Sequence, residues 1–457
     1  MHINPMLKEI ASFFTARDRE ICLVGGAVRD MLLGKKAHDW DLASNAFPEE
    51  VFEIFRKNKL GKVIPTGIKH GTVTVLYKGH NMEITTYRAE TAYTDGRRPD
   101  NVQYISSIQD DLSRRDFTMN AIALRLPGGD KIDPFGGEAD LKAKLIRCVG
   151  NPSARFSEDG LRPMRAVRFA AQLSFNVETK TLSAIPGALD KLAGVSAERI
   201  RDETEKIILS DKPSRGLLLM EQTGILKLIL PELAACRGVD QNVYHDFDVL
   251  DHCLLACDYA AEKNYSLEVR LAALFHDTGK TVMRNLKDGT WTFYKHEMES
   301  EKIARRTLSR FKFPNTVIHS VCHLVKEHMF HYTDDWTDGA VRRFLIRIGE
   351  ANITAFYQLR RADAFAKSAS EPALDFLLPL VRRVEKVLAE NHAFSLKDLA
   401  VSGKDLLTIG IQPGKSMGLI LNLLLETVLD DPGVNTRQNL LRIARNLHEK
   451  ISAEMHK

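Results

Sequence analysis

The sequence predicts an α+β fold, with a mixed sheet and its helices near the N-terminus and helices over the rest of the chain. Short apolar or alternating β-rich stretches at residues 21–24 and 71–88 are typical of strands. Apolar residues recur at helical spacing from residue 138 onward. The length of 457 residues indicates roughly two to four domains. We expect a head at 1–150, a helical neck at 151–230, a helical domain at 231–370 and a helical tail at 371–457.

The composition indicates a soluble intracellular protein. Hydrophobic residues make up 44% of the chain, which supports several cores, and charged residues make up 27%, an ordinary share. The net charge of +4 allows nucleic-acid binding without arguing for it, so any basic surface must be local. The six cysteines form no Cys-x-x-Cys pair, which excludes a zinc ribbon and a thioredoxin-type motif. We see no signal-peptide pattern and no apolar run that could span a bilayer, so we expect a cytoplasmic protein with no membrane partner.

The most informative stretch lies near the N-terminus, where residues 23–34 precede Asp39 and Asp41. The pattern predicts an apolar strand, a glycine turn, a helix that is closed by Gly34 and a second strand that carries the two aspartates. Alternation along a strand places Asp39 and Asp41 on one face, roughly 7 Å apart. Because two carboxylates so placed repel each other, they need a cation, and Mg²⁺ leaves coordination positions open for phosphate oxygens.

The glycine turn itself suits a phosphate group. Gly25 and Gly26 have no side chain that would keep an anion from the backbone, and the start of the next helix offers N–H groups. Arg29, one turn further, can add a charge-assisted contact. An Asp-x-Asp pair is also common on solvated surfaces, and Gly-Gly can be a plain turn. The order of these residues nevertheless favours a two-metal nucleotidyl-transfer site.

A hairpin is expected after the second strand and the helix that starts at Pro48. Residues 71–77 and 82–88 alternate and are β-rich, and residues 78–81 join them. Glu83 on the second of these strands can supply a third carboxylate beside the aspartates, or it can be an ordinary solvated glutamate. The sequence does not decide between the two.

Two adjacent arginines follow a polar segment at 89–107 that is expected to be a loop. Residues 110–121 are expected to enter a helix that carries Arg114 and Arg115. Beside a metal–phosphate site these side chains are suitable triphosphate ligands, although paired arginines usually only solvate a helix. A second glycine turn at 133–137 ends this α/β part of the chain.

Residues 138–230 are expected to be helical, and one helix carries a candidate pair for base recognition. Asp159 and Arg162 lie three residues apart, so on a helix they project from neighbouring positions. They can form an ion pair with each other, or they can present an acceptor and a donor fork to the pairing edge of a base. Arg165 and Arg168 continue a basic stripe that suits phosphates. The helices are expected at 141–145, 158–173, 197–209 and 214–225.

Histidines and aspartates recur along the middle of the chain. His276 and Asp277 end an apolar helix that is expected at 269–275. A single histidine would be an ordinary core residue, whereas an ordered set on helices is a reasonable ligand set for a divalent transition metal. The set consists of His252, His276, Asp277 and Asp363, with His296 and His328 as further candidates.

The chain is expected to be helical again from about residue 371. A glycine-containing turn at 402–414 can expose N–H groups to a nucleic-acid backbone, or it can simply connect two helices. No internal repeat or low-complexity linker is evident, so neighbouring domains are expected to abut.

Four motifs stand out when the chain is taken as a whole. They are Gly25-Gly26 with Arg29-Asp30, Gly34 and Asp39-x-Asp41; Arg114-Arg115-Asp116-Phe117-Thr118-x-Asn120-Ala121; Asp133-Pro134-Phe135-Gly136-Gly137; and Glu158-Asp159-x-x-Arg162. Together they resemble those of the bacterial class II tRNA nucleotidyltransferases, the CCA-adding enzymes, and the resemblance covers nearly the whole chain. It implies a DNA polymerase β-like nucleotidyltransferase head (a mixed sheet with helices), followed by an elongated all-α neck, an HD body and a tail.

The resemblance also implies roles for individual residues. Asp39 and Asp41 would bind two catalytic Mg²⁺ ions, with Glu83 as the third carboxylate. Asp159 and Arg162 would select CTP and later ATP by hydrogen bonds to their base edges. The implied nucleotide-binding residues are Gly25, Gly26, Arg29, Arg114, Arg115, Asp116, Asn120, Asp159, Arg162, Arg165 and Arg168.

The implied function is template-independent addition of CCA to the tRNA 3′ end, using CTP and ATP and releasing pyrophosphate. Alternatives are an A-only enzyme, a CC-only enzyme and a poly(A) polymerase. Residues 95–99 resemble the flexible loop needed for the final A, which argues against a CC-only enzyme. Residues 67–72 stand where poly(A) polymerases carry Gly-Arg-Arg-Phe, which favours tRNA. The histidine–aspartate set resembles the HD phosphohydrolase domain that is fused to some members. The tail at 397–445 resembles that of members with this fusion. The sequence does not indicate the oligomeric state.

One position makes the geometry of the base-recognition pair less regular. Pro163 follows Arg162 inside the helix expected to select the nucleotide. A proline inside a helix removes an N–H group and clashes with the preceding turn, at a cost of ~3 kcal/mol. We therefore expect this helix to kink or to begin late.

Overall fold

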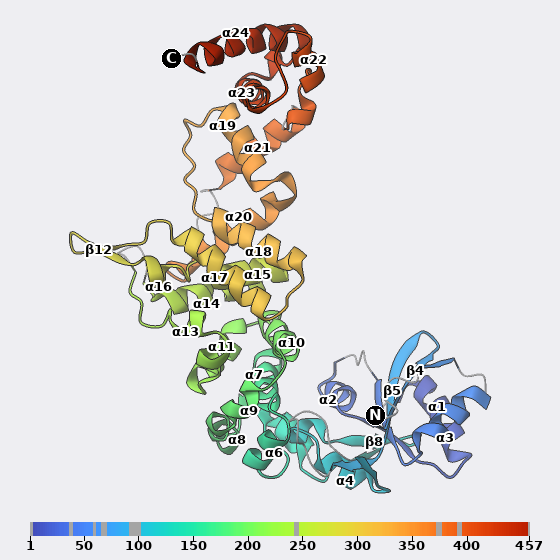
Figure 1. The fold of residues 1–457 in the computed structure, drawn as a ribbon. Coiled ribbons are helices and arrows are strands. Elements are labelled where there is room, and N and C mark those ends of the chain that lie inside the picture. Colours follow the sequence, from blue (N-terminus) through green and yellow to red (C-terminus); the bar gives the residue numbers. More distant parts are fainter. Residues whose placement is uncertain are drawn as a thin grey trace. The chain divides into compact units, whose positions relative to one another are not determined.

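The computed structural model describes residues 3–35, 40–57, 61–64, 71–90, 102–241, 246–371, 377–390 and 395–455. The chain divides into two compact units, whose elements are labelled in Figure 1. The division into four domains that is expected from the sequence is finer than this and stays a prediction. The first unit consists of Met1–Arg237 and Thr307–Phe313, and the second of Gly238–Arg306 and Pro314–Lys457.

The first unit is built on a mixed sheet, as the sequence predicts. Seven strands of the described part of the chain follow the order β3-β4-β5-β2-β1-β8-β9. Strands β2 and β5 run parallel, and the other neighbours run antiparallel. The strands are β1 (Ile21–Val24), β2 (Trp40–Ser44), β3 (Lys62–Ile64), β4 (Thr72–Tyr77), β5 (His80–Thr86), β8 (Ala123–Arg125) and β9 (Asp130–Ile132).

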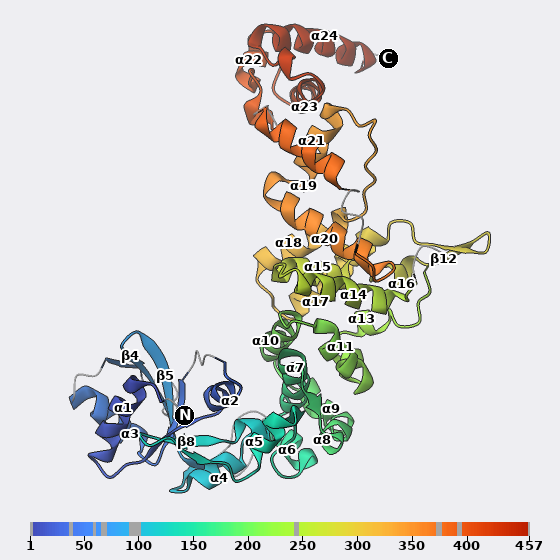
Figure 2. The ribbon, with the colours of Figure 1, turned by 180° about the vertical axis from the view of Figure 1, so that it is seen from behind.

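Helix α3 (Pro48–Lys57) packs against β3, β4 and β5, and α1 (Pro5–Thr15) lies beside α3. They lie together in both views (Figures 1 and 2). The ring of Phe55 contacts the rings of Phe14 and Tyr77, with 6.5 Å between centroids in both cases. Because side chains alternate along a strand, Val73, Val75, Met82 and Ile84 of β4 and β5 are buried, whereas Glu83 between Met82 and Ile84 is exposed on the opposite face.

The strand–turn–helix predicted near the N-terminus is present. Strand β1 leads through Gly25 into α2 (Gly26–Leu32). Gly34, with φ +72°, stands two residues after the helix and provides the left-handed conformation that often ends helices. The hairpin predicted at 71–88 is also confirmed, since β4 and β5 pair directly.

The segment after the hairpin differs from the expectation in two ways. Where a loop was expected, β6 (Arg88–Glu90) pairs with β7 (Val102–Tyr104). The loop predicted at 95–99 lies outside the described residues. The helix expected over 110–121 is shorter, because α4 (Ile108–Ser113) ends before the two arginines and only the short 3₁₀ helix η2 (Thr118–Asn120) follows.

The helix expected to carry Asp159 and Arg162 is divided in two. Helix α6 (Pro152–Glu158) ends before Asp159, whose backbone is extended, and α7 (Arg162–Leu173) begins at Arg162. Pro163 therefore stands in the first turn of α7, where its missing N–H group has no helical partner to lose. The late start expected from Pro163 is confirmed, whereas the premise that the two residues share a helix is wrong.

Helices form most of the rest of the first unit. Helices α10 (Ala197–Ile208) and α11 (Pro213–Gln222) pack against α7, close to the positions expected for them. The region is not helical throughout, because β10 (Leu145–Ile146) and β11 (Asn176–Val177) pair in parallel. The remaining elements are α5 (Gly137–Lys142), α8 (Thr179–Ser183), η3 (Pro186–Ala188), α9 (Leu189–Ala193), α12 (Ile225–Ile229) and α13 (Pro231–Ala234).

The second unit is mainly helical (Figure 1). Helices α14 (Val249–Glu262), α15 (Leu267–Phe275), α18 (Asn315–Glu327) and α20 (Ile353–Ala366) pack against one another. Helix α15 confirms the helix expected at 269–275. Helices α16 (Lys280–Met283), α17 (His296–Arg310) and α19 (Asp338–Ile348) and the 3₁₀ helix η4 (Glu350–Asn352) complete this part.

A β-hairpin in the second unit corrects the expectation of an all-α body. Strand β12 (Asn285–Lys287) pairs antiparallel with β13 (Thr290–Thr292). Asp288 and Gly289, both with positive φ, form the two-residue turn between them. An Asp-Gly dipeptide is a known signal for such a turn, so this hairpin was within reach of sequence reasoning.

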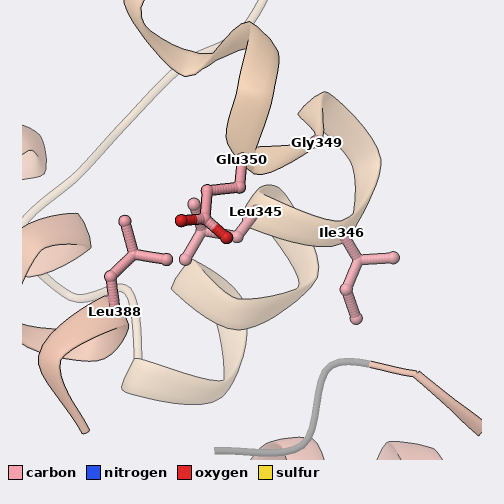
Figure 3. A pocket seen from close by; sticks show the side chains of 5 residues that line it. All are labelled: Leu345, Ile346, Gly349, Glu350 and Leu388. Carbon is pink, nitrogen blue, oxygen red and sulfur yellow. The ribbon is translucent and has the colours of Figure 1, made fainter. Parts of the chain in front are cut away.

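Helix α21 (Leu378–Ala389) packs against α19. The elements after it pack around an apolar cluster that includes Leu406, Leu424 and Leu440. They are η6 (Leu396–Asp398), α22 (Gly403–Leu407), α23 (Lys415–Asp430), η7 (Pro432–Val434) and α24 (Arg437–Met455). A cavity of about 240 Å³ lies where α21 meets the end of α19. Figure 3 shows its lining, formed by Leu345, Ile346, Gly349, Glu350 and Leu388. None of the helices in the described part of the chain is long and apolar enough to cross a membrane.

Candidate active site

The sheet of the first unit aligns two of the predicted carboxylates. Asp41 on β2 is the direct register partner of Glu83 on the parallel strand β5. Both side chains are exposed, while Leu42 and Met82 beside them are buried toward the opposite face. The strand pairing therefore places Asp41 and Glu83 side by side on the polar face of the sheet. Asp39 lies outside the described residues.

Gly25 brings this acidic face close to an arginine. Its φ of +69° is a conformation that favours glycine. A Cβ atom on Gly25 would lie 3.0 Å from Nη1 of Arg115 and 3.4 Å from Oδ2 of Asp41. The absence of a side chain therefore lets a guanidinium and a carboxylate both approach the turn between β1 and α2.

A buried aspartate that was not among the predicted site residues holds both arginines of the second motif. Asp111, on α4, is fully buried and accepts hydrogen bonds from Nε and Nη2 of Arg114 at 3.0 and 2.9 Å and from Nη2 of Arg115 at 3.4 Å. Burial raises the pKa of Asp111, but the two arginines outweigh that effect and the pKa is lowered. Arg114 and Arg115 follow Asp111 by three and four residues, and this spacing could have predicted the contacts from the sequence.

A chain of polar contacts links α2 with α7 through the second motif. Nη1 of Arg29 donates to Oδ1 of Asn120 at 3.0 Å, and Nδ2 of Asn120 donates to Oδ1 of Asp116 at 3.0 Å. Nε of Arg165 donates to the other oxygen of Asp116 at 2.7 Å. Burial raises the pKa of Asp116, but the charge of Arg165 and the hydrogen bonds lower it to about 2. Arg29, Asp116, Asn120 and Arg165 thus form one network.

Arg168 does not continue an open basic stripe. Its Nε lies 2.8 Å from Oε2 of Glu203 on α10, and its guanidinium lies 3.9 Å from the centre of the Phe169 ring. Burial lowers the pKa of Arg168 to about 10. Arg168 and Glu203 are far apart in the sequence, so no local spacing predicted this contact.

Asp159 and Arg162 have separate partners in the structure. Asp159 accepts two hydrogen bonds from Nη2 of Arg199, at 3.1 and 2.9 Å, and one from the backbone N–H of Leu161 at 3.0 Å. Arg162 pairs with Glu158 and donates to the carbonyl oxygen of Arg155 at 2.7 Å. Its Nη2 also donates, at 3.0 Å, to the carbonyl oxygen of the residue at position 114. The side chains of Asp159 and Arg162 therefore do not pair with each other, and each is held by other residues of the protein.

The second unit brings together all six predicted histidines and aspartates. Nε2 of His252 lies 3.0 Å from Nε2 of His276. Oδ2 of Asp277 lies 3.3 and 3.4 Å from these two nitrogens, and Oδ1 of Asp363 lies 3.3 and 3.6 Å from them. All four residues are buried. His252 lies on α14 and Asp363 on α20, while His276 and Asp277 directly follow α15.

Asp277 also joins this group to the remaining two histidines. Its Oδ1 lies 3.0 Å from Nε2 of His296 and 3.7 Å from Nε2 of His328. Two triads could each hold a metal ion, and Asp277 belongs to both. Nδ1 of His276, His296 and His328 lies 2.7–2.8 Å from a backbone carbonyl oxygen, which orients each Nε2 toward the cluster.

Two cations that sequence reasoning missed compensate the buried carboxylates. Nζ of Lys280 lies 2.6 Å from Oδ2 of Asp277, and Nη1 of Arg360 lies 2.6 Å from Oδ2 of Asp363. Burial alone raises the pKa of both aspartates, but the surrounding histidines and cations hold it well below the usual value. Both cations stand three residues from their aspartate, so helical spacing was the available signal.

The histidines of the cluster differ in charge. Burial lowers the pKa of His328 to about 4, which leaves its ring neutral and able to offer a lone pair. Burial also lowers the pKa of His276, but the carboxylates of Asp277 and Asp363 outweigh this and raise it to about 10. A cation is thus favoured between these groups, and imidazole nitrogens with carboxylate oxygens are a donor set that suits divalent transition metals.

Three family profiles match successive parts of the chain. The Poly A polymerase head domain matches residues 21–147. The probable RNA and SrmB-binding site of polymerase A matches residues 174–237. The tRNA nucleotidyltransferase domain 2 matches residues 285–444. The first match covers the sheet that carries Asp41 and Glu83.

Whole-chain comparisons agree with these matches. The chain is 35% identical to the CCA-adding enzyme of Pediococcus pentosaceus over 93% of both proteins. It is 28% identical to the Bacillus stearothermophilus CCA-adding enzyme, solved in complex with CTP, with a TM-score of 0.73 over 99% of this chain and 100% of that one. The Thermotoga maritima CCA-adding enzyme complexed with tRNA shares the fold, with 21% identity, a TM-score of 0.56 and coverage of 97% and 96%. The chain therefore belongs to the CCA-adding enzyme family and is a nucleotidyltransferase.

Proposed function

We propose that this protein adds CCA to the 3′ end of tRNA from CTP and ATP, without a nucleic-acid template. The observation that carries the proposal is the alignment of Asp41 with Glu83 on the polar face of the sheet, beside Gly25 and Arg115. The names of the relatives support it, as does the complex of the Bacillus stearothermophilus enzyme with CTP.

The carboxylates fit the Mg²⁺ ions that nucleotidyl transfer requires. Exposed carboxylate oxygens on adjacent strands are hard donors of the kind that Mg²⁺ prefers, and Asp41 and Glu83 meet that description. We assign Asp39, Asp41 and Glu83 as the ligands. Two bound Mg²⁺ ions would lower the pKa of the attacking hydroxyl group and neutralise charge on the triphosphate.

The other residues of the first unit position the nucleotide and balance its charge. In the reaction the tRNA 3′ oxygen forms a bond to the α-phosphorus, the bond to the pyrophosphate oxygen breaks, and the hydroxyl proton is released. We assign Arg115 to the triphosphate, because Asp111 holds its guanidinium and it lies close to Gly25. Arg29 and Arg165 are fixed through Asn120 and Asp116, so we assign them to the same binding surface.

Base selection is assigned to Asp159 and Arg162. Arg199 orients the Asp159 carboxylate, which keeps acceptor capacity because each carboxylate oxygen has two lone pairs. Glu158 and two backbone carbonyls orient the Arg162 guanidinium. Side chains fixed in this way can read the pairing edges of cytosine and adenine by hydrogen bonds, without a template base.

The test compares three RNA substrates with each nucleoside triphosphate. Full-length protein is incubated with tRNA lacking CCA, with CC-ended tRNA and with generic RNA, and products are sized at nucleotide resolution. We expect CCA on the first substrate, a single A on the second and no addition to the third. An A-only enzyme would extend only the CC-ended tRNA, a CC-only enzyme would stop before A, and a poly(A) polymerase would extend generic RNA with ATP.

A second function is proposed for the histidine–aspartate cluster: metal-dependent hydrolysis of phosphate esters, as in HD domains. The observation that favours it is the convergence of four histidines and two aspartates, with Asp277 shared by both candidate metal triads. In hydrolysis of a 2′,3′-cyclic phosphate, a water oxygen bonds to phosphorus, one ester P–O bond breaks, and the freed sugar oxygen takes a proton. A bound divalent metal would supply the activated water, while Lys280 and Arg360 hold the two carboxylates in place.

Metal analysis of the full-length protein tests this second function. We expect a bound transition metal and hydrolysis of a 2′,3′-cyclic nucleotide, and the loss of both in Asp277→Ala. CCA addition by that variant serves as the control, because Asp277 lies in the second unit. A protein that binds no transition metal and hydrolyses nothing would leave the cluster a purely structural element.

A further inference from the structure

A cavity that neither proposed activity uses lies between α20 and α21 of the second unit. Its volume is about 420 Å³, and cavities of roughly 300–1,000 Å³ hold small-molecule ligands. Helix α20 packs against α14 and α15, whereas α21 packs against α19, so other elements hold the two walls in place. Leu388 lines both this cavity and the smaller one that Figure 3 shows.

The cavity is separate from the histidine–aspartate cluster, although α20 contributes to both. Arg360 is engaged with Asp363 at the cluster, whereas the next residue, Arg361, lines the cavity. The lining residues of α20 recur at helical spacing from Ile353 to Arg361, and those of α21 recur from Val381 to Leu388. One face of each helix therefore forms the wall.

Three polar side chains of this wall lack a partner. The hydroxyl oxygen of Tyr357 is buried without a hydrogen bond. Within the part of the chain that the structure describes, neither the guanidinium of Arg361 nor the carboxylate of Glu385 forms a hydrogen bond or an ion pair. A buried hydroxyl group that stays unpaired is costly, so a ligand that pairs with it gains affinity.

The Tyr357 hydroxyl and the Glu385 carboxylate act on each other from opposite helices. Burial is the main cause that raises the pKa of Tyr357, and the negative charge of Glu385 raises it further. The phenol thus stays protonated at neutral pH, and the carboxylate is near enough to influence it. An ammonium group placed between them would neutralise Glu385 and donate a hydrogen bond to the phenol oxygen.

Arg361 adds a positive charge beside this pair. It follows Tyr357 by four residues on α20, so the two side chains project from neighbouring positions. A ligand carboxylate attached close to the ammonium group would therefore reach the guanidinium. Most of the remaining wall is apolar and includes Val384 and Leu377, which are both buried.

We infer that this cavity binds an α-amino acid with an apolar side chain. The ammonium group pairs with Glu385 and Tyr357, the carboxylate pairs with Arg361, and the side chain contacts the apolar wall. A fatty acid would leave Glu385 unpaired. A nucleotide would bring several negative charges to a wall whose charged groups are one arginine and one glutamate. The inference goes beyond both proposed activities and depends on neither.

Three probes that differ only in their charged groups test the inference. Full-length protein is titrated by calorimetry with L-phenylalanine, with phenylpropanoate, which lacks the ammonium group, and with phenylethylamine, which lacks the carboxylate. We expect phenylalanine to bind about tenfold or more tightly than either analogue, because each charge-assisted contact contributes at least that factor. Equal affinity for all three probes, or no binding of any probe at millimolar concentration, would overturn the inference.

Charge-removing variants assign each contact. Arg361→Gln should lower the affinity for phenylalanine to that for phenylethylamine and leave phenylethylamine binding unchanged. Glu385→Gln should lower it to that for phenylpropanoate and leave phenylpropanoate binding no weaker. Both variants should fold, since neither side chain has a hydrogen bond or ion pair to lose among the described residues. A variant that weakens all three probes equally would refute the role of its charge.

The matched control is Arg382→Gln. Arg382 is an exposed arginine of α21 outside the cavity lining, so the variant should retain the affinities of the wild type. Tyr357→Phe keeps the ring and removes the hydroxyl group. It should weaken phenylalanine and phenylethylamine, which share the ammonium group, but not phenylpropanoate. Weakening of phenylpropanoate alone would contradict the placement of the ammonium group.

Fluorine-labelled tyrosine locates the bound probe. The resonance that disappears in Tyr357→Phe belongs to Tyr357. We expect phenylalanine to shift this resonance with the same Kd that calorimetry gives, because the ring lines the cavity. Binding that shifts other tyrosine resonances and leaves that of Tyr357 unchanged would place the amino acid elsewhere on the chain and overturn the inference.

Discussion

At the scale of single residues, the carboxylates on the polar face of the sheet carry the proposed chemistry. Strand pairing places Asp41 beside Glu83, and both are exposed. We expect Asp41→Asn and Glu83→Gln each to lower the rate of nucleotide addition by at least a hundredfold, because a neutral amide cannot replace a carboxylate ligand of Mg²⁺. Transfer of labelled CMP to tRNA measures the rate, and a filter-binding assay should show unchanged tRNA affinity.

The matched control for these variants is Glu53→Gln. Glu53 is a solvent-exposed carboxylate on α3, paired with Lys57 at 3.0 Å, on a helix that packs against the other side of the sheet. Its loss should leave nucleotide addition within a factor of two of the wild type, since exposed ion pairs contribute little. Substantial activity in Asp41→Asn would refute the assignment of this side chain.

Asp116 provides a prediction about pH, because its pKa is lowered to about 2 by Arg165 and its hydrogen bonds. A carboxyl group whose pKa is depressed on folding stabilises the protein above its unfolded pKa of about 4 and loses that contribution as the pH falls through its folded value. Asp116→Asn should therefore lower the free energy of unfolding by roughly 2 kcal/mol at pH 7. The difference from wild type should disappear as the pH approaches 2, as measured by urea unfolding across pH.

Asp211→Asn is the control for the pH series. Asp211 is exposed in the same unit, and replacement of an exposed aspartate usually changes stability by less than about 0.5 kcal/mol. A deficit of Asp116→Asn that stayed constant from pH 7 to pH 2 would show that packing, and not the ion pair, explains the loss.

At the scale of elements, the turn between β1 and α2 depends on what surrounds its glycine. Gly25 and Gly34 have nearly the same φ, +69° and +72°. A Cβ on Gly25 would lie 3.0 Å from Arg115, whereas a Cβ on Gly34 would have no neighbour within 4 Å among the described residues. Gly25→Ala and Gly34→Ala should thus cost similar backbone strain, about 1 kcal/mol, but only Gly25→Ala should reduce nucleotide addition, by about tenfold or more. Equal losses of activity would mean that strain alone matters at this turn.

The start of α7 carries a prediction about nucleotide choice. Arg162 is held by Glu158 and by the backbone carbonyl oxygens of Arg155 on α6 and of Arg114 at the end of α4. We expect Arg162→Ala to relax the choice of nucleotide more than it slows addition, because a base edge loses a fixed donor. Competition between labelled CTP and UTP measures the choice. Arg155→Ala removes another ion pair to the same glutamate and should retain selectivity; unchanged selectivity in Arg162→Ala would refute base reading at this position.

Elements with a strong local signal were predicted from the sequence, and those set by distant contacts were not. The glycine turn at Gly25, the hairpin at 71–88 and the late start of α7 at Pro163 follow from local stereochemistry. Arg199 and Glu203, both on α10, pair with Asp159 between α6 and α7 and with Arg168 on α7. These residues are far apart in the sequence, and no spacing in the chain encodes such contacts. For this reason the residues of the candidate site were predictable, whereas the partners that hold several of them were not.

At the scale of the whole molecule, two compact units carry two separate candidate sites. The first holds Asp41 and Glu83, and the second holds the six histidines and aspartates. Both sets can be recognised as motifs in the sequence. The structure adds that Nε2 of His252 lies 3.3 Å from Oδ1 of Asp363, although the two residues are far apart in the chain. The sequence therefore predicted which histidines and aspartates belong together, whereas the packing of α14, α15 and α20 brings their side chains into contact.

Ligands for the two sites should therefore stabilise the two units independently. A ligand at about 100 times its Kd stabilises the form that binds it by about 2.7 kcal/mol. We expect Ni²⁺, added without nucleotide after chelation of the purified protein, to raise the midpoint of thermal unfolding seen by fluorine-labelled Trp291, and Mg²⁺ with CTP to raise the midpoint seen by Trp40. Asp277→Ala should abolish the first shift and keep the second.

The control for the Ni²⁺ shift is Asp334→Asn, an exposed aspartate of the second unit that lies outside the cluster. This variant should retain both shifts, because the exposed side chain contributes no ligand in a buried site. A Ni²⁺ shift that persists in Asp277→Ala would place the metal elsewhere on the chain. Because Asp277 belongs to both triads, the loss of this single carboxylate should remove more metal affinity than the loss of His252 or of His296, each of which belongs to one triad.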